Sequence, residues 1–305
     1  MMGQWRVLAC ALVWLAWSAA IARAAPGQSV RFEVVAPVER RVVDLQRVWR
    51  RRLRSLEATV SARRERTGKI VACVRGTRVH VPAVARALVR PGTLELRWVT
   101  SENETTRAWM RTFGVAYAPR HPETRVFAEA NGWRDHNTGE LHLEYALLGP
   151  SPEAIARALA AWPTAYPIPT DLDLWFGPVA DPGLVRTYLV ARTPFLTDKE
   201  VRHAALDDDR RAQEHDVWIE FAPSGAERLA TETAARVGDK LAVVIDGSIR
   251  FAPVIDSPLT RGHFSVLTTG DDEASREADG RSLAAALLGG PLPPGLEARA
   301  AGLCH

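Results

Sequence analysis

The sequence predicts an α+β fold in two parts. Over residues 30–100, short segments with strand periodicity alternate with segments of helical periodicity in the order β-α-β-β-α-β. Over residues 184–293, apolar segments are separated by closely spaced glycine, proline and aspartate residues that mark turns and helix ends. We therefore expect a ferredoxin-like βαββαβ domain at 29–100, followed by an α+β subdomain with a mixed or antiparallel sheet at 184–293.

The elements of the first part follow from apolar periodicity. Residues 42–56 carry apolar side chains at helical spacing, and Pro82 can occupy the first turn of a second helix over 82–90. Strands are expected at 31–35, 58–60, 70–74 and 94–99. Because apolar and polar residues alternate over 94–99, we expect a half-buried strand there. In the β-α-β-β-α-β order it is the last strand, which closes the sheet of the first domain.

Between the two parts, residues 101–183 are predicted as an insert and a linker. Residues 102–110 can form a short helix, and 132–148 indicates a hairpin that turns at its Asn-Thr-Gly sequence. A helix over 151–162 begins with a capping serine followed by proline. Residues 163–182 are rich in proline and aspartate, which favours an irregular loop.

The second part reads as strands that flank two helices. A polar helix or loop is expected over 197–214. The strands are expected at 187–190, 217–221, 241–245, 248–252 and 263–268. Ser224 and Glu227 have the spacing of a capping box for the first helix, and Gly238 can supply its left-handed end.

Turn residues connect the later elements of this part. Asp246-Gly247 is a strong hairpin signal because both positions tolerate positive φ, and Pro253 marks an edge or a bulge. Asp271-Asp272-Glu273 can cap the last helix, which ends at Gly289-Gly290. Gly280 would weaken the middle of this helix by up to about 1 kcal/mol.

Residues 1–24 are predicted as a signal peptide that is cleaved after Ala24. Arg6 supplies the positive charge, and residues 7–21 are apolar apart from Ser18. A retained membrane anchor is the alternative, although this run is about 15 residues and a span needs roughly 20. The mature chain is expected to be soluble, exported and periplasmic, without a membrane span.

Two cysteines, Cys73 and Cys304, remain after this cleavage. They could pair in an oxidising compartment. Cys73 lies in an apolar strand pattern and is the more typical small buried hydrophobe, while Cys304 is penultimate and is expected in a C-terminal tail over 294–305. The sequence therefore leaves the pairing open.

The charges are nearly balanced, with a formal net charge of +3, so no nucleic acid partner is expected. Arg50-Arg51-Arg52 and Arg54 form the dense basic cluster of the chain. It could contact nucleic acid or an acidic membrane surface, but the solvated face of a helix is the more typical explanation.

No catalytic, cofactor-binding or metal-binding residues are predicted. His136, Glu140 and His142 flank a turn, and their spacing fits no helical pair of metal ligands. The run Asp207-Asp208-Asp209 is expected to be a solvated turn. Neither G-x-S-x-G nor G-x-x-x-x-G-K-[ST] occurs in the sequence.

The ordered motifs over 217–293 resemble the head of the first periplasmic domain of SecD, a membrane subunit of the bacterial protein-export machinery. The matching structural motif residues are Gly225, Ala226, Asp246, Gly247, Ala252, Pro253, Ile255, Gly262, Gly270, Leu292 and Pro293. Residues 40–99 resemble the base of the same domain. The resemblance implies a base at 29–100, a head at 184–293 and a periplasmic location.

The sequence also departs from the SecD pattern. Asp198 replaces a usual glycine, and two residues are inserted between Glu277-Ala278 and Leu283-Ala284. SecD has six membrane spans whose carboxylates are thought to use the proton gradient, whereas this sequence ends at His305. The proton-driven activity is therefore not expected to carry over.

The resemblance implies an accessory role in protein export, with contact to unfolded or exported polypeptides or to a membrane translocon component. One alternative is a hydrolase or metal-dependent enzyme built on residues 101–180 with His121, His136, His142 or Glu144. Another is a structural module with no export role.

Overall fold

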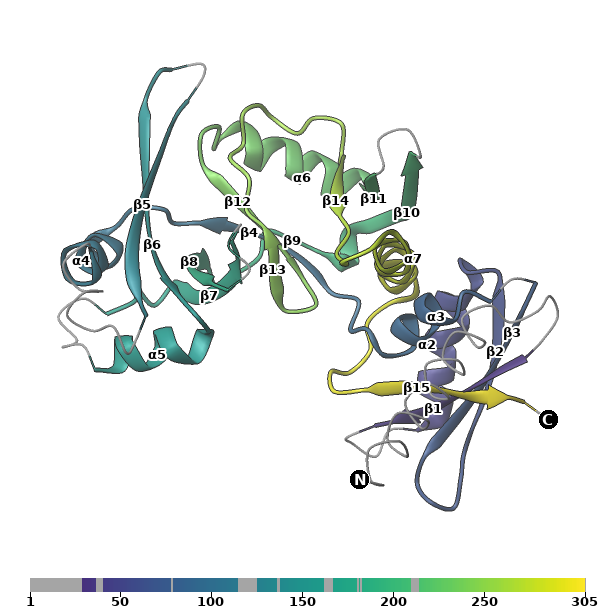
Figure 1. Ribbon diagram of the computed structural model, residues 1–305. Helices are drawn as coiled ribbons and strands as arrows, with labels where there is room; N and C mark the ends of the chain where they lie inside the picture. Colours follow the sequence, from purple (N-terminus) through teal and green to yellow (C-terminus); the bar gives the residue numbers. More distant parts are fainter. Residues whose placement is uncertain are drawn as a thin grey trace, which may run out of the picture. The chain divides into compact units, whose positions relative to one another are not determined.

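The computed structural model divides into two compact units (Figure 1). Unit 1 comprises Met1–Thr93, Val201–Phe221 and His263–His305, and unit 2 comprises Leu94–Glu200 and Ala222–Gly262. The structure describes residues 29–36, 41–77, 79–114, 125–135, 138–161, 167–179, 181, 183–209 and 214–304. The predicted signal peptide lies outside these residues.

Unit 1 contains a four-stranded antiparallel sheet in the order β15-β1-β3-β2. The strands are β1 (Ser29–Val35), β2 (Ala58–Arg64), β3 (Ile70–Gly76) and β15 (Glu297–Leu303). The helices α2 (Val42–Arg54) and α3 (Val81–Val89) complete a β-α-β-β-α-β arrangement, with β15 as its final strand. The predicted α+β class is confirmed, and all pairings between the described strands are antiparallel.

The prediction that residues 94–99 close this sheet is wrong. The strand β4 (Leu94–Val99) pairs with strands of unit 2, and the predicted C-terminal tail at 294–305 contains β15 instead. The physical reason is burial: Leu94, Leu96, Trp98 and Val99 are all buried, so β4 is covered on both faces. An edge strand on a sheet with one open face could not bury both sets of side chains.

The core of this part of unit 1 lies between the sheet and its helices. Trp49 of α2 and Phe32 of β1 are fully buried, and the Trp49 Nε1 donates a hydrogen bond to the Leu88 carbonyl at 2.8 Å. Ala285, Leu292 and Leu296 join the same apolar cluster. The core is therefore assembled from both ends of the chain.

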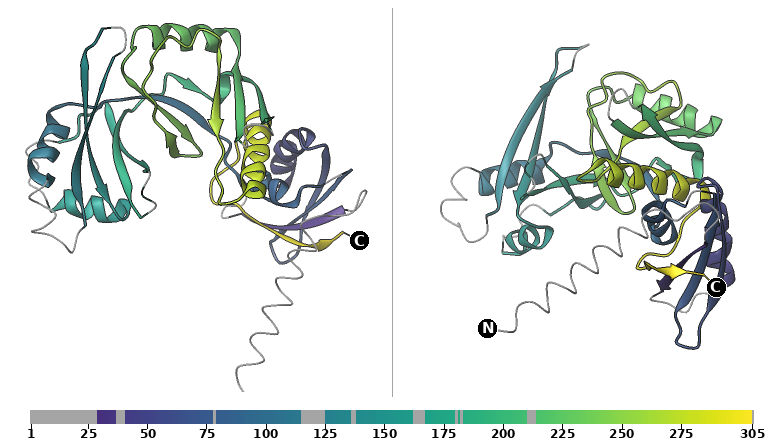
Figure 2. Two further views of the ribbon diagram at one scale, coloured as in Figure 1. Left: turned by 45° about the horizontal axis from the view of Figure 1, so that its top comes forward. Right: turned by 45° about the vertical axis from the view of Figure 1, so that its right-hand side comes forward.

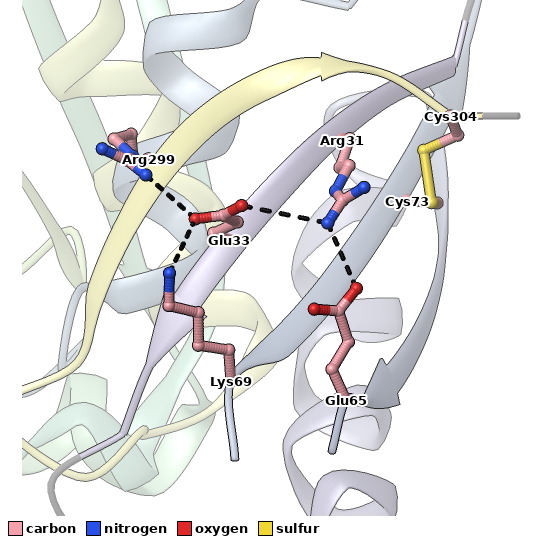
Figure 3. A network of polar contacts seen from close by, with 7 residues as sticks. All are labelled: Arg31, Glu33, Glu65, Lys69, Cys73, Arg299 and Cys304. Carbon is pink, nitrogen blue, oxygen red and sulfur yellow. Dashed lines mark hydrogen bonds and ion pairs between the residues drawn. A yellow bond between two sulfur atoms is a disulfide. The ribbon is translucent and has the colours of Figure 1, made fainter. Parts of the chain in front are cut away.

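The strand β15 is attached by side chains as well as by its ladder to β1 (Figure 3). Arg299 donates to Glu33 of β1 at 3.0 Å, and this hydrogen bond lowers the pKa of Glu33. A disulfide joins Cys73 of β3 to Cys304, with a Cα–Cα distance of 6.1 Å. The sequence left this pairing open, and the structure contains the disulfide.

Glu33 lies at the centre of a network on the same sheet (Figure 3). It accepts a hydrogen bond from Lys69 at 3.4 Å and lies 3.8 Å from Arg31, which in turn donates to Glu65 at 3.1 Å. The network thereby links β15, β1 and the β2–β3 hairpin.

The rest of unit 1 is a three-stranded antiparallel sheet, β10-β11-β14, and the helix α7. The strands are β10 (Val201–Asp209), β11 (Glu214–Phe221) and β14 (His263–Leu267), and α7 covers Glu273–Gly289. In unit 1, α7 packs against α3 and β10 (Figures 1 and 2). Gly280 allows this approach, because a Cβ there would lie 2.4 Å from Leu206 Cδ1.

Two predictions for this region are wrong. Residues 197–214 were expected as a polar helix or loop, and Asp207-Asp208-Asp209 as a turn, but Val201–Asp209 form the strand β10. The apolar alternation of β10 is interrupted by charged residues, so hydrophobic periodicity alone does not reveal it. The predicted cap of the last helix is confirmed, since the Asp272 side chain accepts from the Ser275 amide at 2.7 Å.

Unit 2 is built on an eight-stranded antiparallel sheet with the main order β13-β12-β4-β8-β6-β5. The strands besides β4 are β5 (Phe127–Arg134), β6 (Leu141–Gly149), β7 (Leu172–Pro178), β8 (Val185–Ala191), β9 (Leu196–Thr197), β12 (Lys240–Ile245) and β13 (Ser248–Phe251). The strand β7 pairs with β8, and β9 pairs with β4. The helices α4 (Glu104–Phe113) and α5 (Pro152–Ala160) contribute Trp109, Phe113 and Ile155 to one apolar cluster.

The predicted linker and capping box also need correction. Residues 163–182 contain β7, whose Leu172, Leu174 and Phe176 alternate along the strand. The helix α6 (Pro223–Ala234) begins one residue before Ser224, with Ala222 at its N-cap and no side-chain cap. Proline at the first position fixes the helical φ, which makes Ser224 an internal residue.

Among the described residues, no helix has both the length and the apolar character needed to cross a bilayer.

Candidate functional site

The candidate site is an apolar pocket of about 700 Å³ in unit 2. It lies where β7 meets the turn between β12 and β13. The lining residues are Pro152, Leu174, Trp175, Phe176, Gly177, Pro178, Val179, Leu184, Val185, Gly247, Ser248 and Ile249. No charged side chain is among the described residues that line it, and its volume suits a small apolar group or a few side chains.

One of the lining residues, Gly177, makes a close approach to two neighbouring strands. A Cβ at this position would lie 2.8 Å from Tyr188 Cε2 and 3.3 Å from Ile249 Cβ. Glycine therefore lets β7 lie against β8 and β13 at once. Tyr188 is buried, and burial raises the pKa of its hydroxyl.

The turn at the pocket is the predicted Asp246-Gly247 hairpin turn, and its geometry is confirmed. Asp246 has φ 54° and Gly247 has φ 78°, the positive values that a tight hairpin turn of this kind requires. The turn places Gly247 and Ser248 on the rim of the pocket.

Other motif residues fix the start of β12. The Pro253 carbonyl accepts from the Leu241 amide at 2.9 Å, while the Ile255 carbonyl accepts from Gly238 at 2.8 Å. Ala252 packs against the apolar cluster around Val244. These residues hold the segment after β13 along β12 and thereby position the hairpin.

The motif glycines have packing roles of their own. A Cβ at Gly262 would lie 2.5 Å from the Ala226 Cβ, beside Gly225 at the start of α6. In unit 1, a Cβ at Gly270 would lie 2.7 Å from Ser275 Cβ. The structure thus places only Gly247 at the pocket among the eleven motif residues, and Leu292 and Pro293 lie in unit 1.

Leu292 and Pro293 follow α7. The Leu292 amide donates to the Pro91 carbonyl at 2.8 Å, and its side chain is buried in the core of unit 1. Their contacts therefore fix the chain before β15, in a different part of the fold from the pocket.

Two residues of the alternative enzyme site, Glu144 and His142, have other partners in unit 2. Glu144 is buried and lies 2.6 Å from Lys240 Nζ and 2.8 Å from Arg186 Nη2. His142 stacks on Trp133 with ring centroids 5.7 Å apart. His121 and His136 lie outside the described residues, and in those the structure does describe no cluster of three metal-ligating side chains occurs.

Lys240 links this charged group to an aromatic side chain. Its Nζ lies 4.8 Å from the centroid of Trp133, whose Nε1 donates to the Gly238 carbonyl at 2.9 Å. These contacts tie the β5–β6 hairpin to the start of β12. They give Glu144 a structural role, since its carboxylate is already bound to two cations.

Sequence reasoning missed the pocket residues of β7. Leu172, Leu174 and Phe176 recur with period two, which is a strand signal, but the surrounding prolines and aspartates obscured it. The chemistry of the lining is apolar contact plus the Ser248 hydroxyl, which suits binding of an apolar segment.

Residues 179–294 match the family model described as SecDF, P1 head subdomain. This segment includes the β12–β13 hairpin and the Leu184–Val185 wall of the pocket. It draws on both compact units, and it overlaps the head predicted at 184–293.

Curated relatives show the same similarity. The protein translocase subunit SecD of Acidaminococcus fermentans is 34% identical over 102 residues, which are 33% of this chain and 23% of the relative. That of Treponema pallidum is 34% identical over 86 residues, which are 28% of this chain and 15% of the relative. The matched regions therefore span less than a quarter of these relatives.

Two solved structures also match the chain, both with TM-scores below 0.5. The structure titled "Crystal structure of SecDF in Super-membrane-facing form" is 19% identical with a TM-score of 0.47, covering 92% of this chain and 30% of that chain. The structure titled "Structure and function of a membrane component SecDF that enhances protein export" is 19% identical with a TM-score of 0.44, covering 88% of this chain and 97% of that chain. The resemblance stated from the sequence is thus confirmed by the family and relative matches: residues 179–294 are similar to the P1 head subdomain of SecDF.

Proposed function

We propose that this chain is an exported interaction module with a role in protein export, and that it contacts unfolded or translocating polypeptides through the pocket of unit 2. The similarity of residues 179–294 to the SecDF P1 head subdomain carries the proposal. The curated relatives are named as translocase subunits, and one related structure is titled as a component that enhances protein export.

The pocket supports contact with an extended chain. Its lining is apolar, and unfolded polypeptides expose apolar side chains that folded proteins bury. The two strands beside it, β7 and β13, are each paired on one side, with β8 and with β12, among the described strands. Strand edges next to apolar pockets are a recurrent mode of peptide binding.

Site-specific photo-cross-linking in cells tests the proposal. A photoreactive residue at Ser248, which is exposed on the pocket rim, should form adducts with precursors during export. The matched control is the same residue at Ser257, which is exposed in unit 2 but does not line the pocket.

The adducts are identified by mass spectrometry, with and without a block of protein export. Enrichment of exported precursors at Ser248 over Ser257 supports the proposal. Equal, low labelling at both positions contradicts it and favours a structural module with no export role. Adducts with one membrane protein would instead identify a translocon component as the partner.

We propose a periplasmic location, with cleavage after Ala24. The apolar segment at 7–21 supports export, and the Cys73–Cys304 disulfide suits an oxidising compartment. Intact mass and N-terminal sequencing of protein from the periplasmic fraction test this proposal. A mature N-terminus at Ala25 is expected, and recovery of the uncleaved chain with the membrane would contradict it.

A further inference from the structure

The outward side of α2 carries a line of arginines, which we call the arginine ridge: Arg47, Arg50 and Arg54. All three are exposed, and the side chain of Arg47 is 69% accessible. At about 100° per residue, positions 47, 50 and 54 fall within about 60° of one another around the helix axis. Val43, which is 66% exposed, falls on the same line one turn earlier.

The ridge lies opposite the packed side of the helix. Leu45, Trp49, Arg52 and Leu53 of α2 are at most 3% exposed and face the core. The sequence interpretation of a solvated face is therefore wrong for Arg52, which is fully buried. Of the basic cluster at residues 50–54, Arg52 therefore has a structural role in the core. The arginines of the ridge have no such role.

The positive charge of the ridge is poorly compensated. Asp44 lies 3.6 Å from Arg47, but it stands to one side of the line. Within the described part of the chain, Arg50 and Arg54 form no ion pair. A neighbouring exposed arginine, Arg51, adds to the same positive field.

We propose that the arginine ridge docks unit 1 onto an anionic phospholipid surface. From Val43 to Arg54 the line is straight and about 16 Å long at 1.5 Å per residue, which fits a flat surface. The apolar face of α2 is occupied by the protein core, so the contact would be electrostatic: clustered basic side chains are attracted to the negative potential of an anionic lipid surface. Residues 7–21 also predict passage of this chain through a membrane.

The expected effect is set by the number of arginines. A basic side chain near an anionic bilayer contributes a factor of about 5 in affinity, so replacing all three should weaken binding about 100-fold. Because this attraction is screened, binding should also fall as the salt concentration rises.

Co-sedimentation with lipid vesicles tests the inference. The full chain, purified after export, is mixed with vesicles of phosphatidylcholine alone or with phosphatidylglycerol added. The test variant is Arg47→Gln/Arg50→Gln/Arg54→Gln. The matched control is Arg63→Gln/Arg66→Gln/Arg75→Gln, which removes the same charge from exposed arginines of the β2–β3 region.

Phosphatidylcholine vesicles measure any binding by a retained N-terminal segment, which all variants share. Adding phosphatidylglycerol should increase the fraction of protein that sediments with the vesicles. The inference holds if the ridge variant loses this increase and the control variant keeps it. Equal losses in both variants would show a net-charge effect and overturn it. The inference is also overturned if phosphatidylglycerol does not increase vesicle binding of the wild type. It is overturned as well if the ridge mediates binding to polyglutamate and not to vesicles, since the partner would then be an acidic polypeptide.

Discussion

The side chain of Arg52 satisfies backbone carbonyls at the ends of two helices of unit 1. It donates to Ala87 at 3.0 Å and to Arg90 at the end of α3, and to Gly290 just after α7. A further bond reaches Pro91 at 2.9 Å. The last carbonyls of a helix lack partners within it and carry partial negative charge, so a buried guanidinium is a suitable donor.

We predict that Arg52→Ala destabilises unit 1 by about 3 kcal/mol or more, because several buried carbonyls lose a charged donor. Urea unfolding followed by circular dichroism measures this change. The control Arg50→Ala lies two positions away on the exposed side of α2 and should change stability by no more than about 0.5 kcal/mol. Similar midpoints for the two variants would contradict the role of Arg52.

His80 makes the start of α3 sensitive to acid. Its Nδ1 accepts a hydrogen bond from the Ala83 amide at 3.2 Å, which requires an unprotonated nitrogen. Burial lowers the pKa of His80, while Glu277 raises it and Arg281 and Arg86 lower it. The cap therefore contributes fully above the unfolded value near 6.5, and its contribution is lost as the pH falls through the lowered pKa of the folded state.

We predict that His80→Asn removes this pH dependence, since asparagine caps helices without titrating near neutrality. The thermal midpoints of both proteins are compared between pH 8 and pH 5. The wild type should lose about 1 kcal/mol more stability than the variant on acidification. Parallel curves for the two proteins would show that the cap does not titrate in this range.

At the scale of elements, β15 depends strongly on its cross-link. Ala298 and Ala300 are its residues that pack on the core, and Leu303 is 49% exposed, so the strand buries little apolar surface. Its ladder to β1 is interrupted by an irregularity between Val30 and Phe32. The disulfide compensates by joining positions 231 residues apart.

We predict that Cys304→Ser destabilises unit 1 by about 2–5 kcal/mol, the usual effect of removing a native disulfide. Denaturant unfolding is measured with and without a reductant. The reductant should lower the wild type to the level of the variant and leave the variant unchanged. The Cys73→Ser variant should have the same stability as Cys304→Ser. If complete reduction leaves the stability of the wild type unchanged, the prediction is refuted.

Several elements could be predicted because their signals are local. Ser151 caps α5 through the Ala154 amide, as expected, and Asp272 caps α7. The strand β7 was missed because its alternation covers few residues and lies in a segment typical of loops. Local patterns thus located the helices and most of the strands, and failed where prolines or charged residues obscure the alternation, as in β7 and β10.

At the scale of the whole molecule, the sequence predicts the kinds of elements better than their partners. The alternation in β4 is equally compatible with an edge of the first sheet and with a central position in unit 2. Which sheet β4 joins is decided by its pairing with β12 and β8, which lie far along the chain. The pocket could not be predicted for the same reason, since it forms where β7 meets a hairpin some 70 residues later.

The discontinuous build of unit 1 makes its C-terminal strand essential. We predict that a chain ending at Pro293, which lacks β15 and Cys304, leaves the outer edge of β1 unpaired and destabilises the base. Hydrogen exchange should show faster exchange of amides in β1, whereas those of β6 in unit 2 should keep their protection. Unchanged protection in β1 would mean that residues 294–305 behave as a dispensable tail. Loss of protection in β6 as well would show that the two units unfold together and do not act independently.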